Sequence, residues 1–292
     1  RPLGQQKFNV EHQILDDGLL VRTRHIRPIA GQSHLELYHQ DSLLGTVPIS
    51  RFVGASHHAF FVRPKPEYRF VDRLLVRMSP DTSESVGREE RVRLQVAGFD
   101  DTTTLTVDSL MTARIPRESL YEPRFFELAM ERVVTKGALK MNSDAYRLRP
   151  EEFASRQPMQ LRYRIPIPNE GNPLSGICRL DDSGKSWIWL GGMESDALLH
   201  GSSTQGGTFA AVFDYDPPVI SDLNLTDGKL VRDSMPAIRF SLRDNLSGIE
   251  DDRSILIKID GQWVIPEYDP ESGICRTEPA KPLGLGEHHL SI

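Results

Sequence analysis

Apolar and polar residues alternate in short runs along most of the chain, as they do in strands that bury one face. Residues 34–38, His-Leu-Glu-Leu-Tyr, show the alternation most clearly. Successive side chains of a strand point to opposite faces of its sheet, so the two leucines are expected to face a core. Longer β-type runs occupy residues 71–78 and 90–97. The pattern predicts many short strands and almost no helix.

Turn residues separate these runs. The chain has 22 glycines and 20 prolines among its β-branched and aromatic residues, which is typical of short strands joined by turns. Residues 181–184, Asp-Asp-Ser-Gly, predict a hairpin turn with the glycine at positive φ, and Asp260-Gly261 predicts another. Asp17-Gly18 and Gly45 are also expected to mark turns. Residues 125–130 fit either a strand or one helical turn, and a strand is favoured.

The turn residues divide the chain into three segments, 1–97, 98–215 and 216–292. The last boundary is the clearest, because Pro217 and Pro218 follow Asp214 and Asp216 and cannot continue a sheet ladder. Since the final run reaches residue 292, the third segment is expected to lack one closing strand. The predicted fold class is all-β, with two or three tandem β-sandwich domains.

Composition narrows the class of protein. Hydrophobic residues make up 38% of the 292 residues and charged residues 26%, as in a globular chain rather than a disordered one. The net charge is −6, and the basic residues form no stripe along the sequence. Nucleic acid is therefore not an expected partner. No run approaches the ~18 apolar residues of a membrane helix. The chain starts at Arg1 without a leader, so we expect a piece of a longer protein.

Four features occur in order in the third segment. They are a Pro-Pro entry at 216–220, Asp-x-x-Ser-Gly-Ile at 244–249, the Asp-Gly hairpin at 260–261 and Leu-x-x-Gly-x-His at 283–288. In this order the features resemble a bacterial immunoglobulin-like (Ig-like) module. The resemblance covers about a quarter of the chain and implies a sandwich of antiparallel sheets.

The second segment carries further sequence cues. They are Ala-Arg-Ile-Pro at 113–116 with Ser-Leu-Tyr-Glu-Pro at 119–123, Tyr-Arg-Leu-Arg-Pro at 146–150, Ser-Trp-Ile-Trp-Leu-Gly-Gly at 186–192 and Gly-Gly-Thr-Phe-Ala at 206–210. The combination is similar to the C-terminal regions of lysostaphin-type (LytM-like) zinc endopeptidases of Gram-negative bacteria. The resemblance implies an exported parent, periplasmic or otherwise in the cell envelope, whose catalytic domain cuts peptidoglycan.

A lysostaphin-type zinc site needs a His-x-x-x-Asp pair together with a His-x-His, and leaves one position open for water. We expect none of the nine histidines to supply the His-x-x-x-Asp pair, and none falls in a His-x-His. His34, Glu36 and His39 come nearest, but His39 points to the other face of the strand and a solvated face is favoured. No catalytic residue is predicted, and zinc is expected only in an upstream domain.

Calcium is the one cofactor that the sequence suggests for this region. Its candidate ligands gather around the entry of the third segment: Asp214, Asp216, Asp244, Asn245, Asp251 and Asp252. Calcium takes six to eight oxygen ligands, and acidic clusters can supply them. The same residues are common turn formers, and the turn interpretation is favoured.

Aromatic and sulfur-containing residues offer two more candidates. Trp187 and Trp189 share one strand face, where they could bind a sugar ring, although packing is the favoured interpretation. Cys178 and Cys275 each lie in a Ser-Gly-Ile-Cys-Arg pentapeptide. They are expected to be buried thiols, with a disulfide between them as the alternative.

These observations favour a non-catalytic spacer and interaction region of an exported envelope protein, with a protein partner or peptidoglycan as its contact. One alternative is a carbohydrate- or peptidoglycan-binding module that uses Trp187 and Trp189. A second alternative is that the region is itself a metallopeptidase. Retention on purified peptidoglycan would support the first alternative, because a spacer is expected not to be retained. Bound zinc together with hydrolysis of wall peptides would support the second.

Overall fold

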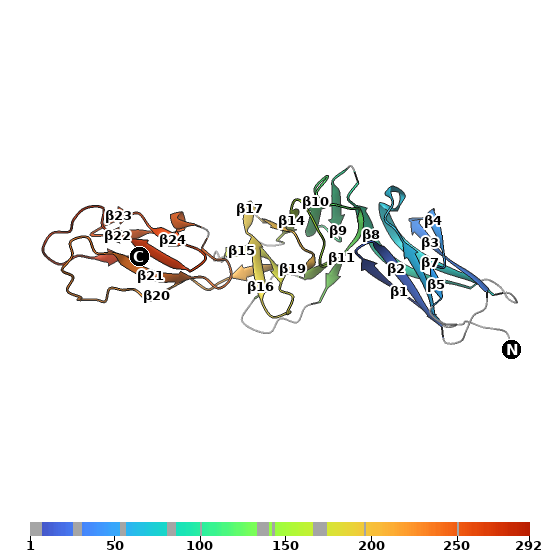
Figure 1. Cartoon of the computed structure of the whole chain (residues 1–292), viewed down its shortest axis with the longest axis horizontal. Helices are drawn as coiled ribbons and strands as arrows, with labels where there is room; N and C mark the ends of the chain where they lie inside the picture. Colours follow the sequence, from blue (N-terminus) through green and yellow to red (C-terminus); the bar gives the residue numbers. More distant parts are fainter. Residues whose placement is uncertain are drawn as a thin grey trace. The chain divides into compact units, whose positions relative to one another are not determined.

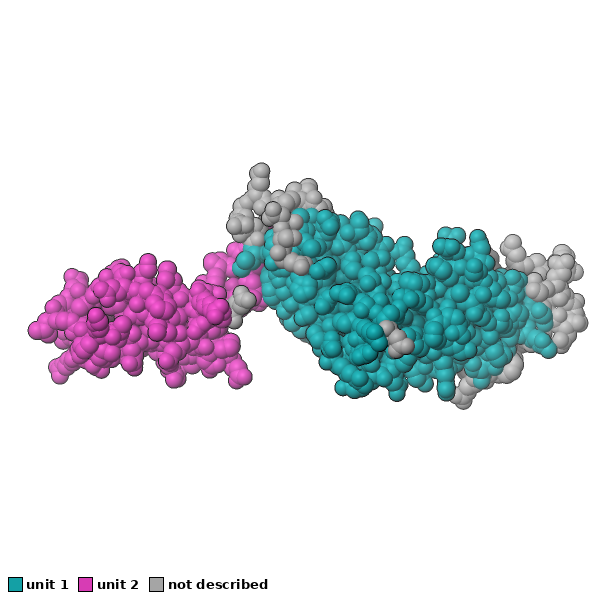
Figure 2. All heavy atoms as spheres, turned by 90° about the horizontal axis from the view of Figure 1, so that it is seen from above, with its two compact units in different colours: residues 1–213 teal, residues 214–292 magenta. Residues whose placement is uncertain are grey.

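A computed structural model of the chain is built from antiparallel strands, and the residues it describes contain no α-helix (Figure 1). The structure describes residues 8–25, 31–52, 57–80, 86–99, 101–132, 140–141, 144–165, 174–195, 197–249 and 251–292. The all-β prediction is confirmed. The chain divides into two compact units, unit 1 at Arg1–Phe213 and unit 2 at Asp214–Ile292 (Figure 2).

Unit 1 is built on a large antiparallel sheet of ten strands. From one edge to the other, its strands are β16 (Trp187–Gly191), β15 (Leu174–Leu180), β19 (Gly207–Asp214), β13 (Ala145–Arg149), β11 (Arg124–Glu131), β8 (Val86–Ala97), β7 (Phe70–Pro80), β3 (Gly31–His39) and β4 (Ser42–Pro48), with β12 (Lys140–Met141) beside β19. The strand predicted at 125–130 is confirmed as β11.

Two smaller sheets complete unit 1. The first small sheet has the order β1 (Phe8–Leu15), β2 (Gly18–His25), β6 (His57–Val62) and β5 (Arg51–Phe52). The second small sheet has the order β17 (Met193–Ser195), β18 (Leu198–Ser203), β14 (Met159–Arg164), β10 (Met111–Ile115) and β9 (Thr103–Thr106). A short 3-10 turn, η1 (Pro66–Tyr68), precedes β7.

Each small sheet forms its own core with the large sheet, and β11 contributes to both cores. Phe125 packs in the first core with Leu19 and Leu94, whereas Phe126 packs in the second core with Leu105. Neighbouring residues of one strand point to opposite faces, so the two small sheets cover opposite faces of the large sheet. The 97/98 segment boundary lies inside unit 1, and the large sheet crosses it through the pairing of β8 with β11.

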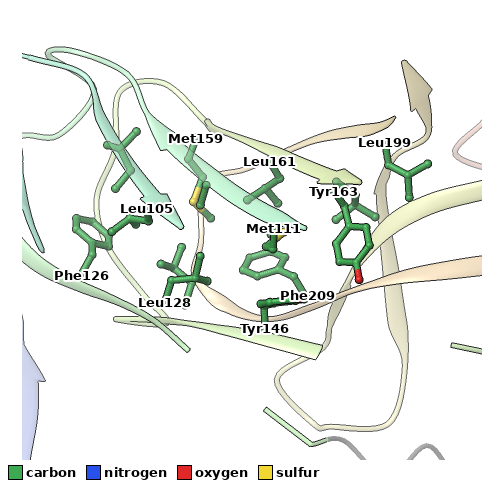
Figure 3. Packing of buried hydrophobic residues seen from close by; sticks show 14 of the residues in the cluster. Leu105, Met111, Phe126, Leu128, Tyr146, Met159, Leu161, Tyr163, Leu199 and Phe209 are labelled. Atoms are coloured by element: carbon green, nitrogen blue, oxygen red, sulfur yellow. The ribbon is translucent and has the colours of Figure 1, made fainter. Parts of the chain in front are cut away.

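The second core is dominated by large side chains. In Figure 3, Phe126, Leu128 and Phe209 of the large sheet point toward Met111 and Leu161 of the second small sheet. All five side chains are at most 2% exposed. At roughly 25 cal/mol per Å² of buried apolar surface, such clusters supply most of the stability of a sheet pair.

Unit 2 is a smaller two-sheet sandwich. One sheet has the order β20 (Val219–Ser221), β21 (Ile238–Arg243), β25 (Ile274–Thr277) and β24 (Glu267–Asp269), and the other has β23 (Gln262–Val264), β22 (Ile257–Ile259) and β26 (Leu290–Ser291). Phe240, Ile257 and Cys275 lie in the core between them. A 3-10 turn, η2 (Asp252–Ser254), precedes β22.

Both predicted hairpins are confirmed. Asp181 to Gly184 forms the turn between β15 and β16, with Gly184 at φ +68°. Asp260 and Gly261 join β22 to β23 with φ of +50° and +78°.

The turn predicted at Asp17-Gly18 is confirmed: residues 16–17 form it, and Gly18 begins β2. Gly45 is not in a turn but lies in β4, where the ring of Tyr68 covers it. The turn that precedes β4 contains Gln40, at φ +53°. A side chain at Gly45 would meet the Tyr68 hydroxyl at 2.5 Å, so close packing explains this glycine.

Candidate functional site

Two of the predicted calcium ligands, Asp214 and Asp244, organise the entry to unit 2. Asp214 accepts hydrogen bonds from the backbone N–H of Asp216 at 3.1 Å and of Ser247 at 2.9 Å. Asp244 Oδ1 accepts from the N–H groups of Leu246 and Gly248, both at 2.9 Å. Both carboxylates act as turn formers that bind backbone donors. Ser247 is the residue that brings them together, because its hydroxyl also donates to Asp244.

The remaining calcium candidates are distributed differently. Asp251 caps η2 by accepting from the N–H of Arg253 at 2.8 Å, and the exposed Asp252 begins that turn. Within the described ranges, no group of three or more His, Cys, Asp or Glu side chains is arranged to hold a metal ion. The arrangement supports the turn-forming interpretation for Asp214, Asp244 and Asp251.

Trp187 and Trp189 lie on β16, the edge strand of the large sheet, and both are half-buried. Leu190 points to the opposite face of β16 and packs against the second core. The Trp189 ring lies over Gly176 of the neighbouring β15, where a side chain would collide with it. The pair therefore covers the outer surface of a hairpin, and glycine leaves the space that Trp189 occupies.

We expect Gly176→Ala to lower the stability of unit 1 by about 1–3 kcal/mol, because the added methyl overpacks this site. The new Cβ would meet the Trp189 ring and lie 2.6 Å from the carbonyl oxygen of Gly191. Denaturant unfolding, followed by tryptophan fluorescence, measures the loss. Gly192→Ala is the matched control, because its Cβ meets only ordinary contacts at 3.6 Å. Equal midpoints for the two variants would contradict the packing of Trp189.

His34 and Glu36 of β3, which the sequence offered as possible metal ligands, belong to a structural ion-pair cluster. Glu36 accepts hydrogen bonds from Tyr38 at 2.8 Å and from Arg77 Nε at 2.9 and 3.0 Å, and its Oε1 lies 3.0 Å from His34 Nε2. Burial raises the pKa of Glu36, but the bonds from Arg77, Tyr38 and His34 outweigh it and lower that pKa overall. His39 faces Asp72 instead, at 3.3 Å. The cluster ties β3 to β7.

A second polar cluster, which we call the His12 cluster, joins the first small sheet to the large sheet. His12 of β1 lies 2.9 Å from Glu90 of β8 through Nδ1 and 3.4 Å from Glu127 of β11 through Nε2. Glu127 also pairs with Arg149 of β13 at 3.1 Å. The side chains of His12 and Glu127 are only 12% and 11% exposed.

The charges of this cluster are fixed by its geometry. Burial alone would lower the pKa of His12, but its contacts with Glu127 and Glu90 raise that pKa to about 9. Burial likewise raises the pKa of Glu127, and the contacts with His12 and Arg149 reverse this effect and lower it. At neutral pH the cluster therefore holds a cationic histidine between two carboxylates.

Sequence reasoning missed the His12 cluster. The expectation that no histidine supplies a His-x-x-x-Asp pair is wrong, because His12 and Asp16 have this spacing. The structure separates them: His12 faces Glu90 and Glu127, whereas Asp16 is exposed in the turn after β1. The local signal that could have drawn attention was a lone histidine within an alternating strand. Its partners lie 78 and more residues away in the sequence.

The two cysteines occupy buried positions in different units. Cys178 lies on β15 and Cys275 on β25, and each side chain is 0% exposed. Burial raises the pKa of Cys275, so that thiol is protonated at neutral pH. The expectation of buried residues is confirmed for both positions.

Comparison with protein-family models, with curated proteins and with solved structures found no match. Among the residues that the structure describes, no helix is long and apolar enough to cross a membrane.

Proposed function

We propose that this chain is a non-catalytic spacer and interaction region of an exported cell-envelope protein. The proposal rests on the polar clusters, whose described contacts hold the fold together. The His12 cluster joins two sheets, Glu36 joins two strands, and Asp214 and Asp244 bind the backbone of loops. These groups stabilise a rigid scaffold, and binding would then fall to its surfaces and loops.

The sequence resemblance supports a more specific setting. Segments 113–123, 146–150 and 186–192 resemble regions that follow the catalytic domain of lysostaphin-type zinc endopeptidases. We therefore propose a peptidoglycan endopeptidase as the parent, with zinc held outside this region. Two consecutive prolines, Pro217 and Pro218, restrict the backbone near the start of unit 2, which suits a spacer region.

Co-sedimentation of the 292-residue chain with purified peptidoglycan tests this proposal. We expect the chain to remain in the supernatant and to release no soluble wall fragments, because its role is to position other parts. A matched variant, Trp187→Ala with Trp189→Ala, accompanies the wild-type chain. Retention that this variant loses would replace the proposal with a carbohydrate-binding module. Wall-fragment release that a zinc chelator abolishes would replace it with a metallopeptidase.

A further inference from the structure

A surface hollow of about 380 Å³ lies on unit 2 between η2 and β24. Ile265, Tyr268 and Ile274 give it an apolar lining, and the carboxylates of Asp252, Glu267 and Asp269 stand around it. Its volume falls in the range of ~300–1,000 Å³ that small binding sites occupy. The combination of apolar and acidic side chains suits a group that is aliphatic along its length and positively charged at its end.

The charge of unit 2 favours a cationic ligand. Residues 214–292 contain eight Lys and Arg against fifteen Asp and Glu, a formal charge of −7, whereas residues 1–213 carry +1. Within the hollow, neither Asp252 nor Glu267 forms an ion pair with a described residue, and Arg276 is the one basic residue of the described lining.

Asp269 keeps its charge at neutral pH. Its carboxylate accepts hydrogen bonds from the Ser272 hydroxyl at 2.6 Å and from the Glu271 N–H at 3.1 Å, and these bonds lower its pKa. A charge that is fixed in this way adds to the negative field of the hollow rather than being lost by protonation.

The strand beside the hollow offers a backbone edge and apolar side chains. β24 is an edge strand of its sheet, and β23, just before it in sequence, is an edge strand of the other sheet. Trp263 of β23 and Ile265, which directly follows this strand, are 55% and 66% exposed. Of the seventeen large apolar residues exposed in the described chain, ten lie in unit 2. Edge strands with exposed apolar side chains are suited to bind an extended peptide.

We infer that the edge formed by residues 262–269 binds an extended basic peptide, with a Lys or Arg side chain in the hollow and apolar side chains against Trp263 and Ile265. The aliphatic stem of such a residue packs on Ile265 and Tyr268, while its charged end reaches Asp252, Glu267 and Asp269. This inference rests on the proposed interaction role and names its partner class.

Calorimetric titration of the 292-residue chain with the capped peptide Lys-Val-Lys-Val-Lys-Val tests the inference. We expect binding that weakens as salt is added, since the rim charges are exposed. Glu267→Gln and Asp252→Asn should each weaken binding about two- to fivefold, in line with exposed ion pairs. Ile265→Ser should weaken it about tenfold, because the apolar contact is lost. Circular dichroism of each variant verifies that unit 2 is folded.

The controls separate a site from general attraction to an acidic unit. Asp227→Asn makes the same change of charge at an exposed residue of unit 2 that does not line the hollow, and it should leave binding unchanged. Equal weakening by Asp227→Asn and Glu267→Gln would overturn the site. If a Glu-Val-Glu-Val-Glu-Val peptide binds as tightly as the lysine peptide, the preference for a cationic ligand is wrong. If spermidine binds as tightly, the site does not require an extended peptide. Peptidoglycan co-sedimentation does not depend on these results, so the two proposals fail separately.

Discussion

Replacing Glu127 with alanine is expected to destabilise unit 1 by about 3 kcal/mol, because the variant leaves a buried cationic histidine without one of its two carboxylates. His12 is held by Glu127 and Glu90 where β1 lies over the large sheet, and Arg149 loses the same partner. Denaturant unfolding of the 292-residue chain, with the loss read from the unit 1 transition, gives the change in free energy.

Glu131→Ala is the matched control for this prediction. Glu131 lies on the same strand and pairs with Arg147 of the same neighbouring strand at 3.0 Å, but its side chain is 31% exposed. Glu131 is half-buried and also accepts a hydrogen bond from Thr208 at 2.8 Å, but it is more accessible than Glu127 and does not neutralise a buried histidine. Ion pairs near the surface contribute about 0–1 kcal/mol, so the control should lose less stability. A double-mutant cycle of His12→Leu with Glu127→Leu should show a coupling energy of about 1–3 kcal/mol. Equal losses for Glu127→Ala and Glu131→Ala would contradict the role of burial.

The same cluster predicts how stability depends on pH. The pKa of His12 is raised from 6.5 to about 9, so its contribution is complete below pH 6.5 and is lost as pH rises through 9. The pKa of Glu127 is lowered from 4.5, so its contribution is present above 4.5 and is lost as pH falls through the lowered value. We expect the cluster to stabilise unit 1 most between about pH 4.5 and 6.5, with an alkaline decline that His12→Leu removes. Melting temperatures of the wild-type chain and of His12→Leu, measured from below pH 4.5 to above pH 9, test the effect.

The features that the sequence predicted correctly are those with local causes. Residues 181–184 and Asp260-Gly261 form the expected hairpins, because glycine and aspartate adopt positive φ within the turn itself. Gly45 shows the limit of such reasoning, because a glycine required by the distant Tyr68 looks the same in sequence as a glycine required by a turn.

Features with distant causes were not predicted. The pairing of β8 with β11 continues one sheet past the 97/98 boundary, and no local pattern specifies which strands become neighbours. The His12 cluster depends on three strands that lie far apart in sequence. The acidic residues near 214 and 244 were considered as calcium ligands or turn formers, and only the fold shows that backbone N–H donors occupy Asp214 and Asp244.

The strongest test of this architecture uses two adjacent phenylalanines of β11. Phe125 belongs to the first core and Phe126 to the second, and both are 0% exposed. Phe125→Ala and Phe126→Ala are each expected to cost about 3–5 kcal/mol through lost burial and a residual cavity. Because one strand serves both cores, we expect each variant to lower a single cooperative transition of unit 1, measured by scanning calorimetry.

Hydrogen exchange locates how far each substitution acts. Phe125→Ala should speed exchange in β14 and β19 of the second core as well as in β2 and β6 of the first, because the cores unfold together through the shared sheet. Phe240→Ala, in the core of unit 2, is the control and should leave exchange in unit 1 unchanged. Exchange that rises only around the substituted core would instead mean that residues 8–97 and 98–213 unfold as separate modules. A shared strand makes the first result the expected one, because opening β11 exposes apolar surface on both of its faces at once.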